Sequence, residues 1–184
     1  MTSLTQNQYV AMDKYLPTQR TLHWITGLLI LGLFAVGVWM RSLSYYDPWY
    51  QTAPIWHKEI GIITAILIML RVIWRIKSGV PKPLSSHKKW EIHLAHLIHI
   101  LMYLMIFVII LSGYLIATAD NRGIDVFGIF EVPAVINAIE NQEDIAGFIH
   151  EWVAYGLIAL VVFHVAGALK HHVIDKDSTL KRML

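Results

Sequence analysis

The sequence predicts an all-α integral membrane protein, a bundle of four transmembrane helices. Of its 184 residues, 56% are hydrophobic and only 15% are charged, whereas an ordinary soluble domain has about 25% charged residues. Four stretches are long enough to cross a hydrocarbon core, which requires about 20 mainly apolar residues. These stretches are Leu22–Met40, Trp56–Ile76, His93–Ala119 and Ile145–Leu169.

The first two stretches differ in their charges. Leu22–Met40 has none, and the segment before it contains Asp13 and no apolar run behind a basic head, so we expect a retained anchor rather than a cleaved signal. The second stretch has Lys58 and Glu59 in its first turns and Arg71 near its end. Charges at these positions can reach water from the helix ends, so a membrane crossing is still expected.

The last two stretches carry their polar residues near their starts. The third begins with three histidines and is strictly apolar from Ile100 to Ala117, and the fourth has Glu151 in its first turns. Trp and Tyr side chains prefer the headgroup level of a bilayer. They lie near the ends of the apolar runs at Trp24, Trp39, Trp56, Trp74, Trp90, Tyr114 and Trp152.

The distribution of Lys and Arg predicts the orientation. Twelve of the 15 basic residues lie in the N-terminal tail, in the 71–91 connection or after Leu169. Cytoplasmic loops of membrane proteins carry the excess of basic residues, so we expect a multi-pass membrane protein with both termini cytoplasmic. We expect tails at 1–17 and 177–184, a membrane domain at 18–176, and a short surface helix within 132–141 of the acid-rich outer loop.

Ten histidines is a high number for this length, and most lie in or beside apolar stretches, where an unpaired polar ring is costly. Any one of them could satisfy a backbone carbonyl or lie in the interface. The chain has no cysteine, which excludes disulfides, iron–sulfur clusters, thiolate zinc sites and thioether-attached haem. A metal centre would therefore use His, Met or carboxylate ligands.

Four of the histidines form two predicted pairs. His150 and His164 are 14 residues apart, which places them within about 40° of one helix face and about 21 Å apart along the axis. The topology brings His57 level with His150 at the outer side, and His23 level with His164 at the inner side. Facing imidazoles are ligands for six-coordinate haem iron, so these pairs predict two haems b.

Small residues follow each predicted ligand by four positions, one turn along the same helix face. A flat macrocycle lying edge-on to a helix would need this turn to be free of bulky side chains. Small residues also serve helix packing in membranes. The four residues are Gly27, Gly61, Ala154 and Ala168.

The other histidines do not follow this pattern. His93, His96 and His99 lie at the start of the third helix, and each is rotated by about 60° from the one before, so they do not share one face. His96 and His99 are candidates for hydrogen bonding and proton exchange at a quinone headgroup. The alternative is that all three simply lie in the membrane interface. His171 and His172 are expected in the interface, with His171 a fallback ligand for iron. We expect His87, in the basic loop, to be solvated.

The outer face is otherwise acidic, so its few cations form a second candidate site. Lys58 adjoins His57, and Arg122 lies in the next outer connection. A small anionic donor would be attracted to such a positive spot.

Several short motifs, taken in their order and spacing, resemble the bacterial cytochrome b561 family, which is related to the cytochrome b subunits of nickel hydrogenases. These motifs are R-x-x-H-W at 20–24, H-K-x-x-G at 57–61, A-H-x-x-H at 95–99, N-R-G at 121–123, H-E at 150–151 followed by His164 and H-H at 171–172, and K-D-S-T-L-K-R-M at 176–183.

The resemblance implies a four-helix bundle with two haems b, whose ligands carry over to His23, His57, His150 and His164. It also implies quinone-linked electron transfer, with superoxide:ubiquinone oxidoreductase activity attributed within the family. The acid-rich 124–145 loop departs from the family pattern, which leaves the outer electron donor open.

We therefore expect an oxidoreductase that passes electrons from superoxide or another small donor at the periplasmic face to ubiquinone. One alternative is a cytochrome b subunit that serves a partner redox protein in a larger hydrogenase-type complex. A non-redox alternative is a His-lined transporter or channel. The expected surroundings are the lipid bilayer and quinone, with no nucleic acid.

Overall fold

A computed structural model describes residues 14–136 and 140–184 of the chain. In this part, long helices make up most of the structure, and a short hairpin and one 3-10 turn are added to them. The elements are α1 Pro17–Met40, α2 Thr52–Ser78, α3 Lys89–Ala117, β1 Ile124–Val126, β2 Phe130–Val132, α4 Gln142–Val173 and η1 Leu180–Arg182.

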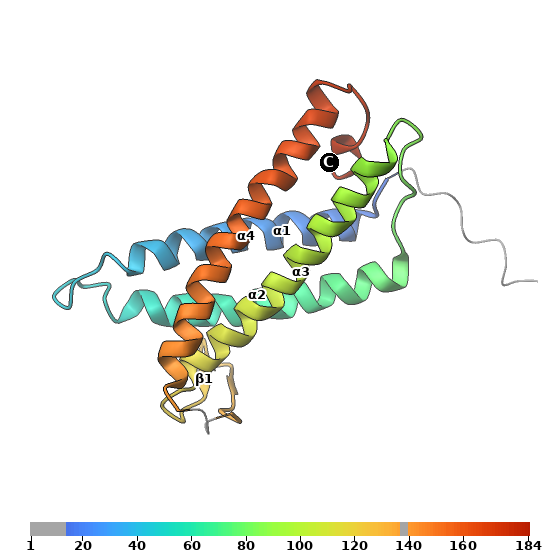
Figure 1. The fold of residues 1–184 in the computed structure, drawn as a ribbon. Helices are drawn as coiled ribbons and strands as arrows, with labels where there is room; N and C mark the ends of the chain where they lie inside the picture. The colour runs from blue at the N-terminus through green and yellow to red at the C-terminus, as the bar shows by residue number, and fades with distance from the viewer. Residues whose placement is uncertain (1–13, 137–139) are drawn as a thin grey trace, which may run out of the picture.

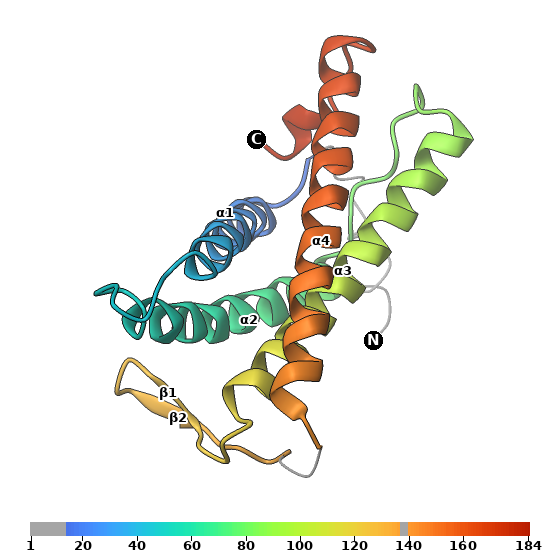
Figure 2. The same ribbon diagram turned by 60° about the vertical axis from the view of Figure 1, so that its left-hand side comes forward.

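The helices associate as two antiparallel pairs. α1 lies along α2, α3 lies along α4, and the two pairs cross each other obliquely (Figures 1 and 2). The small buried core lies where they cross, and it contains Ile68 of α2, Ile106 of α3 and Leu157 of α4, with Ile30 of α1 packed against it. The core is thus an apolar layer halfway along the bundle.

The outer surface of the bundle suits a lipid environment. In the described residues, α1, α3 and α4 are long and apolar enough to cross a membrane. Large apolar side chains point outward, with Leu28, Phe107 and Phe163 each more than 60% exposed. A membrane helix bundle is therefore confirmed; the crossing by α2, which has 27 residues and packs against α1, stays a prediction.

Both described ends of the chain lie at the same end of the bundle as the α2–α3 connection. The Trp24 indole N–H donates to the Met183 carbonyl over 2.9 Å, and the Gln19 amide donates to the Gly79 carbonyl over 2.8 Å. Gln19 also accepts the N–H of Leu16 at the start of α1, where Pro17 suits the first helical position because it has no N–H to satisfy.

The connection between α3 and α4 differs from its prediction. It begins with the hairpin β1–β2, in which Ile124 faces Val132, and residues 133–136 form no regular element. The Tyr114 hydroxyl donates to the Pro133 carbonyl and accepts the Val135 N–H, which attaches this segment to the end of α3. The predicted helix within 132–141 is wrong for residues 132–136, 140 and 141, which form no helix. Residues 137–139 lie outside the described part of the chain.

Candidate functional site

Histidine rings face each other at two levels of the bundle. The ring centroids of His57 on α2 and His150 on α4 are 6.3 Å apart, and those of His23 on α1 and His164 on α4 are 6.2 Å apart. The structure thus brings together the same two pairs that the depth of the residues along the helices predicts.

The spacing of each pair fits one metal ion between two imidazoles. An imidazole nitrogen binds a first-row metal at about 2.0–2.1 Å, and the ring centre lies about 1.1 Å behind this nitrogen. Two rings on opposite sides of one ion therefore place their centres about 6.3 Å apart. Both pairs have a separation that would suit two ligands of one metal ion, such as the iron of a haem.

A cavity of about 600 Å³ adjoins the outer pair, His57 and His150, and all four long helices contribute to its wall. Its volume is within the range of about 300–1,000 Å³ that is usual for cofactor pockets. Gly61 and Ala154 line it, and a Cβ at Gly61 would meet nothing within 4 Å. The small residues after the outer histidines therefore border open space, as a flat ring system would require.

A hydrogen bond orients one of the two outer histidines, His150. Nδ1 of His150 lies 3.0 Å from the Ile109 carbonyl; because a carbonyl only accepts, this nitrogen donates its N–H, and Nε2 keeps its lone pair for a metal. Nδ1 of His57 is buried and has no hydrogen-bond partner in the described part of the chain. A buried imidazole nitrogen without a partner fits a ligand role, so the outer pair fits a haem.

Two further glycines contact the outer pair, and sequence reasoning missed them. A Cβ at Gly113 would lie 3.1 Å from Cε1 of His150, and a Cβ at Gly37 would lie 3.5 Å from Cε1 of His57. Each glycine lies on a helix that faces the histidine rather than on the histidine's own helix. No spacing within one helix signals such a contact, so only the fold reveals it.

The inner pair has a more polar environment. The ring centroid of His99 lies 5.1 Å from that of His164, and Nη2 of Arg71 lies 2.8 Å from Nδ1 of His23. Arg71 also lies over the Tyr103 ring, 5.7 Å from its centroid. A Cβ at Gly27, one turn after His23, would meet nothing within 4 Å, and Ala168 is half-buried.

The two residues predicted to contact quinone, His96 and His99, differ in their exposure to solvent. His99 is half-buried beside His164, whereas His96 is exposed one turn nearer the helix start. His93 is exposed as well, and its ring N–H donates to the Lys89 carbonyl over 2.6 Å. Only His99 of the three thus touches the inner pair.

The outer cations also differ in their surroundings. Lys58 is exposed, lines the outer cavity and has no ion-pair partner within the described residues. Arg122 pairs with Asp120 at 2.9 Å, and its backbone N–H is the main cause that holds the pKa of this carboxyl below its usual value. Arg41 pairs with Glu151 at 2.8 Å. Lys58 therefore carries the positive charge least compensated by a neighbour.

A membrane helix bundle with facing histidine pairs is the architecture of a membrane cytochrome b. A model of the family described as "Prokaryotic cytochrome b561" matches residues 14–184. The chain therefore belongs to the prokaryotic cytochrome b561 family, as the motifs predict, and membership excludes the transporter or channel alternative.

Curated relatives cover nearly the whole chain. "Cytochrome b561 homolog 2" of Escherichia coli (strain K12) is 46% identical over 94% of this chain and 92% of its own length. "Cytochrome b561 homolog 1" of the same organism is 28% identical over 94% and 98%. "Probable superoxide oxidase CybB" of Yersinia pestis is 25% identical over 93% and 96%.

Proposed function

We propose that the chain is a di-haem cytochrome b that passes electrons from superoxide, taken up at the periplasmic face, to ubiquinone. The observation that carries the proposal is the two facing histidine pairs, His57 with His150 and His23 with His164. With about 1.5 Å of rise per residue, the two histidines of α4 lie about 21 Å apart along the helix axis. Cofactors at these levels would span most of the hydrocarbon core.

The chain's own residues would hold and shield two haems, which supply one-electron redox chemistry when bound. The Ile109 carbonyl fixes the ring of His150. Between the two levels, Ile68, Ile106 and Leu157 form the apolar layer, which keeps water and ions from crossing the bundle with the electron.

Lys58 is the proposed attraction point for the donor. It adjoins His57, lines the outer cavity and would draw an anion by its charge. Superoxide gives up one electron and leaves as dioxygen. Arg122 is a second proposed contact, with part of its charge compensated by Asp120. The Yersinia relative named as a probable superoxide oxidase supports this choice of donor.

His99 is the proposed partner of ubiquinone. Its ring lies beside His164 and can donate a hydrogen bond to a quinone carbonyl. Ubiquinone takes two electrons and two protons to become ubiquinol, so each ubiquinol requires two superoxide ions. His96, exposed one turn nearer the basic end, is the proposed route by which protons enter from the cytoplasm.

The proposed location is the bacterial inner membrane with both termini in the cytoplasm. Both described ends of the chain gather with the α2–α3 connection, and these segments hold most of the Lys and Arg. The excess of basic residues on the cytoplasmic side supports the orientation.

Reconstituted vesicles with oriented protein test the proposal. Superoxide is generated on one side only, and haem reduction and ubiquinol formation are followed. We expect reduction only from the side of Lys58, and slower ubiquinol formation in His99→Ala and His96→Ala. Equal reduction from both sides would refute the outer donor site, and normal ubiquinol formation in both variants would refute the quinone assignment.

A second candidate is a cytochrome subunit that receives electrons from a partner redox protein. The α1–α2 connection favours it, because Tyr45 and Tyr46 are 73% and 92% exposed and Trp49 is 54% exposed, and aromatic side chains are enriched in protein interfaces. Co-purification with a soluble redox subunit, lost when all three are replaced by Ser, would favour this candidate over superoxide.

A further inference from the structure

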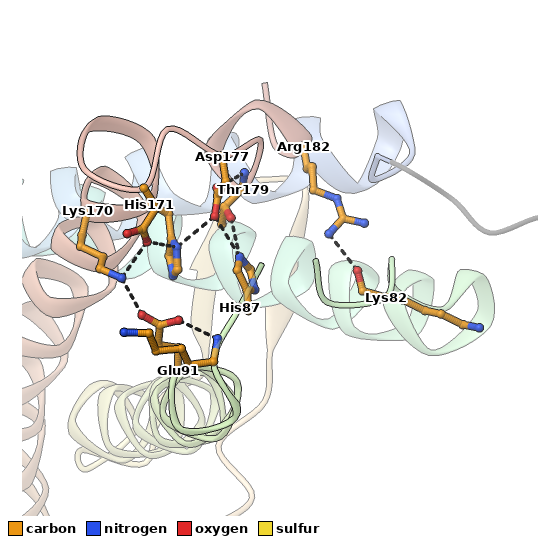
Figure 3. Close-up of polar contacts among 10 residues, drawn as sticks. Lys82, His87, Glu91, Lys170, His171, Asp177, Thr179 and Arg182 are labelled. Atoms are coloured by element: carbon orange, nitrogen blue, oxygen red, sulfur yellow. Dashed lines mark hydrogen bonds and ion pairs between the residues drawn. The ribbon is translucent and has the colours of Figure 1, made fainter. Parts of the chain in front are cut away.

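Three side chains from distant parts of the chain converge near the C-terminal end of α4 (Figure 3). His87 comes from the α2–α3 connection, His171 from the last turn of α4 and Asp177 from the segment after it. Oδ2 of Asp177 lies 3.2 Å from Nε2 of His87 and 3.1 Å from Nδ1 of His171. The centroids of the two rings are 4.5 Å apart.

This cluster is largely shielded from solvent. The side chains of His87 and His171 are each 14% exposed and that of Asp177 is 10% exposed. The expectation that His87 is solvated is therefore wrong, because the C-terminal segment folds over it. His171, the fallback iron ligand, has its Nδ1 within this cluster.

The close contacts among these side chains leave polar atoms unmatched, and Nδ1 of His171 is buried without a hydrogen bond in the described part of the chain. Nδ1 of His171 lies 2.8 Å from Asp175 as well as 3.1 Å from Asp177, and Nε2 of His87 lies 2.9 Å from the Thr179 hydroxyl as well as near Asp177. A ring nitrogen of a neutral imidazole carries at most one hydrogen. Several oxygens thus converge on nitrogens that cannot donate to all of them, which is a set of lone pairs that a cation would satisfy.

The distances suit tetrahedral coordination. Zinc binds His nitrogen and carboxylate oxygen at about 2.0–2.2 Å, so neighbouring ligand atoms of a tetrahedral site lie about 3.3 Å apart. The two contacts of Asp177 are within 0.2 Å of this value, and the ligand atoms of all three residues lie within 4.8 Å of one another.

We propose that His87, His171 and Asp177 bind a divalent transition-metal ion, Zn²⁺, through Nε2, Nδ1 and Oδ2. Water or the Thr179 hydroxyl completes the tetrahedron. Nitrogen ligands favour Zn²⁺ over Mg²⁺, which prefers oxygen ligands and octahedral geometry.

The neighbouring acids have another partner. Nζ of Lys170 lies 2.5 Å from Glu91 and 2.6 Å from Asp175, so its charge compensates these two carboxylates and leaves Asp177 as the carboxylate for the ion. The bound ion would join the α2–α3 connection to the C-terminal segment. This site is separate from both histidine pairs and does not depend on the proposed function.

Zinc titration of the full-length, haem-loaded protein tests the proposal. The protein is stripped with EDTA, and Zn²⁺ or Mg²⁺ is added in a calorimeter. We expect one Zn²⁺ per chain, no comparable heat from Mg²⁺, and an affinity at least about tenfold lower in His87→Gln, His171→Gln and Asp177→Asn. His93→Gln, which removes an exposed histidine at the same end, should bind as the unmodified chain does.

The haem spectrum of each variant reports whether it is folded. X-ray absorption of Zn²⁺ on the unmodified protein needs no variant, and it should show imidazole nitrogen and carboxylate oxygen near 2.0–2.1 Å. No stoichiometric zinc in the unmodified chain, unchanged affinity in the folded ligand variants, or an equal loss in His93→Gln would overturn the proposal.

Discussion

The guanidinium of Arg71 donates a hydrogen bond to Nδ1 of His23, with 2.8 Å between Nη2 and Nδ1. Arg keeps its proton under all ordinary conditions, so Nδ1 is the acceptor and Nε2 carries the hydrogen of the neutral ring. An iron ligand that binds through Nε2 has the opposite tautomer, with the hydrogen on Nδ1. If His23 held iron through Nε2, this contact would have to break, and Arg71 would then be available to an anionic group such as a haem propionate.

Replacement of Arg71 should change the inner haem alone. A nearby positive charge stabilises ferrous over ferric iron, because reduction lowers the charge at the metal. We expect Arg71→Gln to lower the inner midpoint potential by roughly tens of millivolts at protein-like dielectric, in a redox titration followed by visible absorption. Lys77→Gln, an exposed cation at the same end of α2, should leave both potentials unchanged. If the inner midpoint potential were unchanged in Arg71→Gln, Arg71 would not pair with a propionate of the inner haem.

Leucine at the small residues should displace haem. Ala154 lines the outer cavity, and overpacking costs about 1–3 kcal/mol, or roughly 5- to 150-fold in affinity. Ala159→Leu, exposed on the same helix, is the control and should keep full haem content. We expect Ala154→Leu and Gly61→Leu to lower occupancy of the outer haem. Gly27→Leu and Ala168→Leu should lower occupancy of the inner haem. Full haem content in all four variants would mean that these residues serve helix packing only.

A methyl group at Gly113 should disturb the outer site. Its Cβ would lie 3.1 Å from Cε1 of His150, so the ring would have to shift by a few tenths of an ångström. We expect weaker outer haem binding in Gly113→Ala, measured by haem titration. Gly32→Ala meets open space and should be neutral or stabilising by up to about 1 kcal/mol, because Ala favours a helix over Gly. Equal affinity in both variants would contradict the close contact.

Charge reversal at Lys58 should slow reduction by superoxide more than charge reversal at Arg122. Lys58→Glu removes a charge without an ion-pair partner in the described residues, whereas Arg122→Glu acts where Asp120 already compensates. We expect a several-fold slower reduction by superoxide at low salt for Lys58→Glu, a smaller effect for Arg122→Glu, and convergence at high salt. Stopped-flow absorption measures these rates. If neither substitution changed the rate of reduction, a partner protein would be favoured as the electron donor.

Much of the architecture follows from local signals. The hydrophobic stretches locate the helices, and the 14-residue interval between His150 and His164 fixes one helix face. Topology then leaves His57 and His23 as their neighbours. These predictions succeed because helix geometry is rigid and the membrane fixes depth.

Other features depend on contacts between distant segments. The proximity of Gly113 to His150 and of Arg71 to His23 depends on how the two helices of each antiparallel pair face each other. The proximity of His87 to Asp177 requires the C-terminal segment to fold back. The hairpin after α3 also escaped prediction, since Val132 and Pro133 suit several short conformations. No periodicity in the sequence encodes such contacts.

Haem content per chain tests the central claim most directly. The purified chain should contain two haems b, and His57→Ala and His23→Ala should each retain one, with different redox potentials, because each removes a ligand from a different pair. His150→Ala should match His57→Ala, and His164→Ala should match His23→Ala. If His57→Ala and His23→Ala emptied the same site, or if the unmodified chain held a single haem, the assignment of the two pairs to two haems would be wrong.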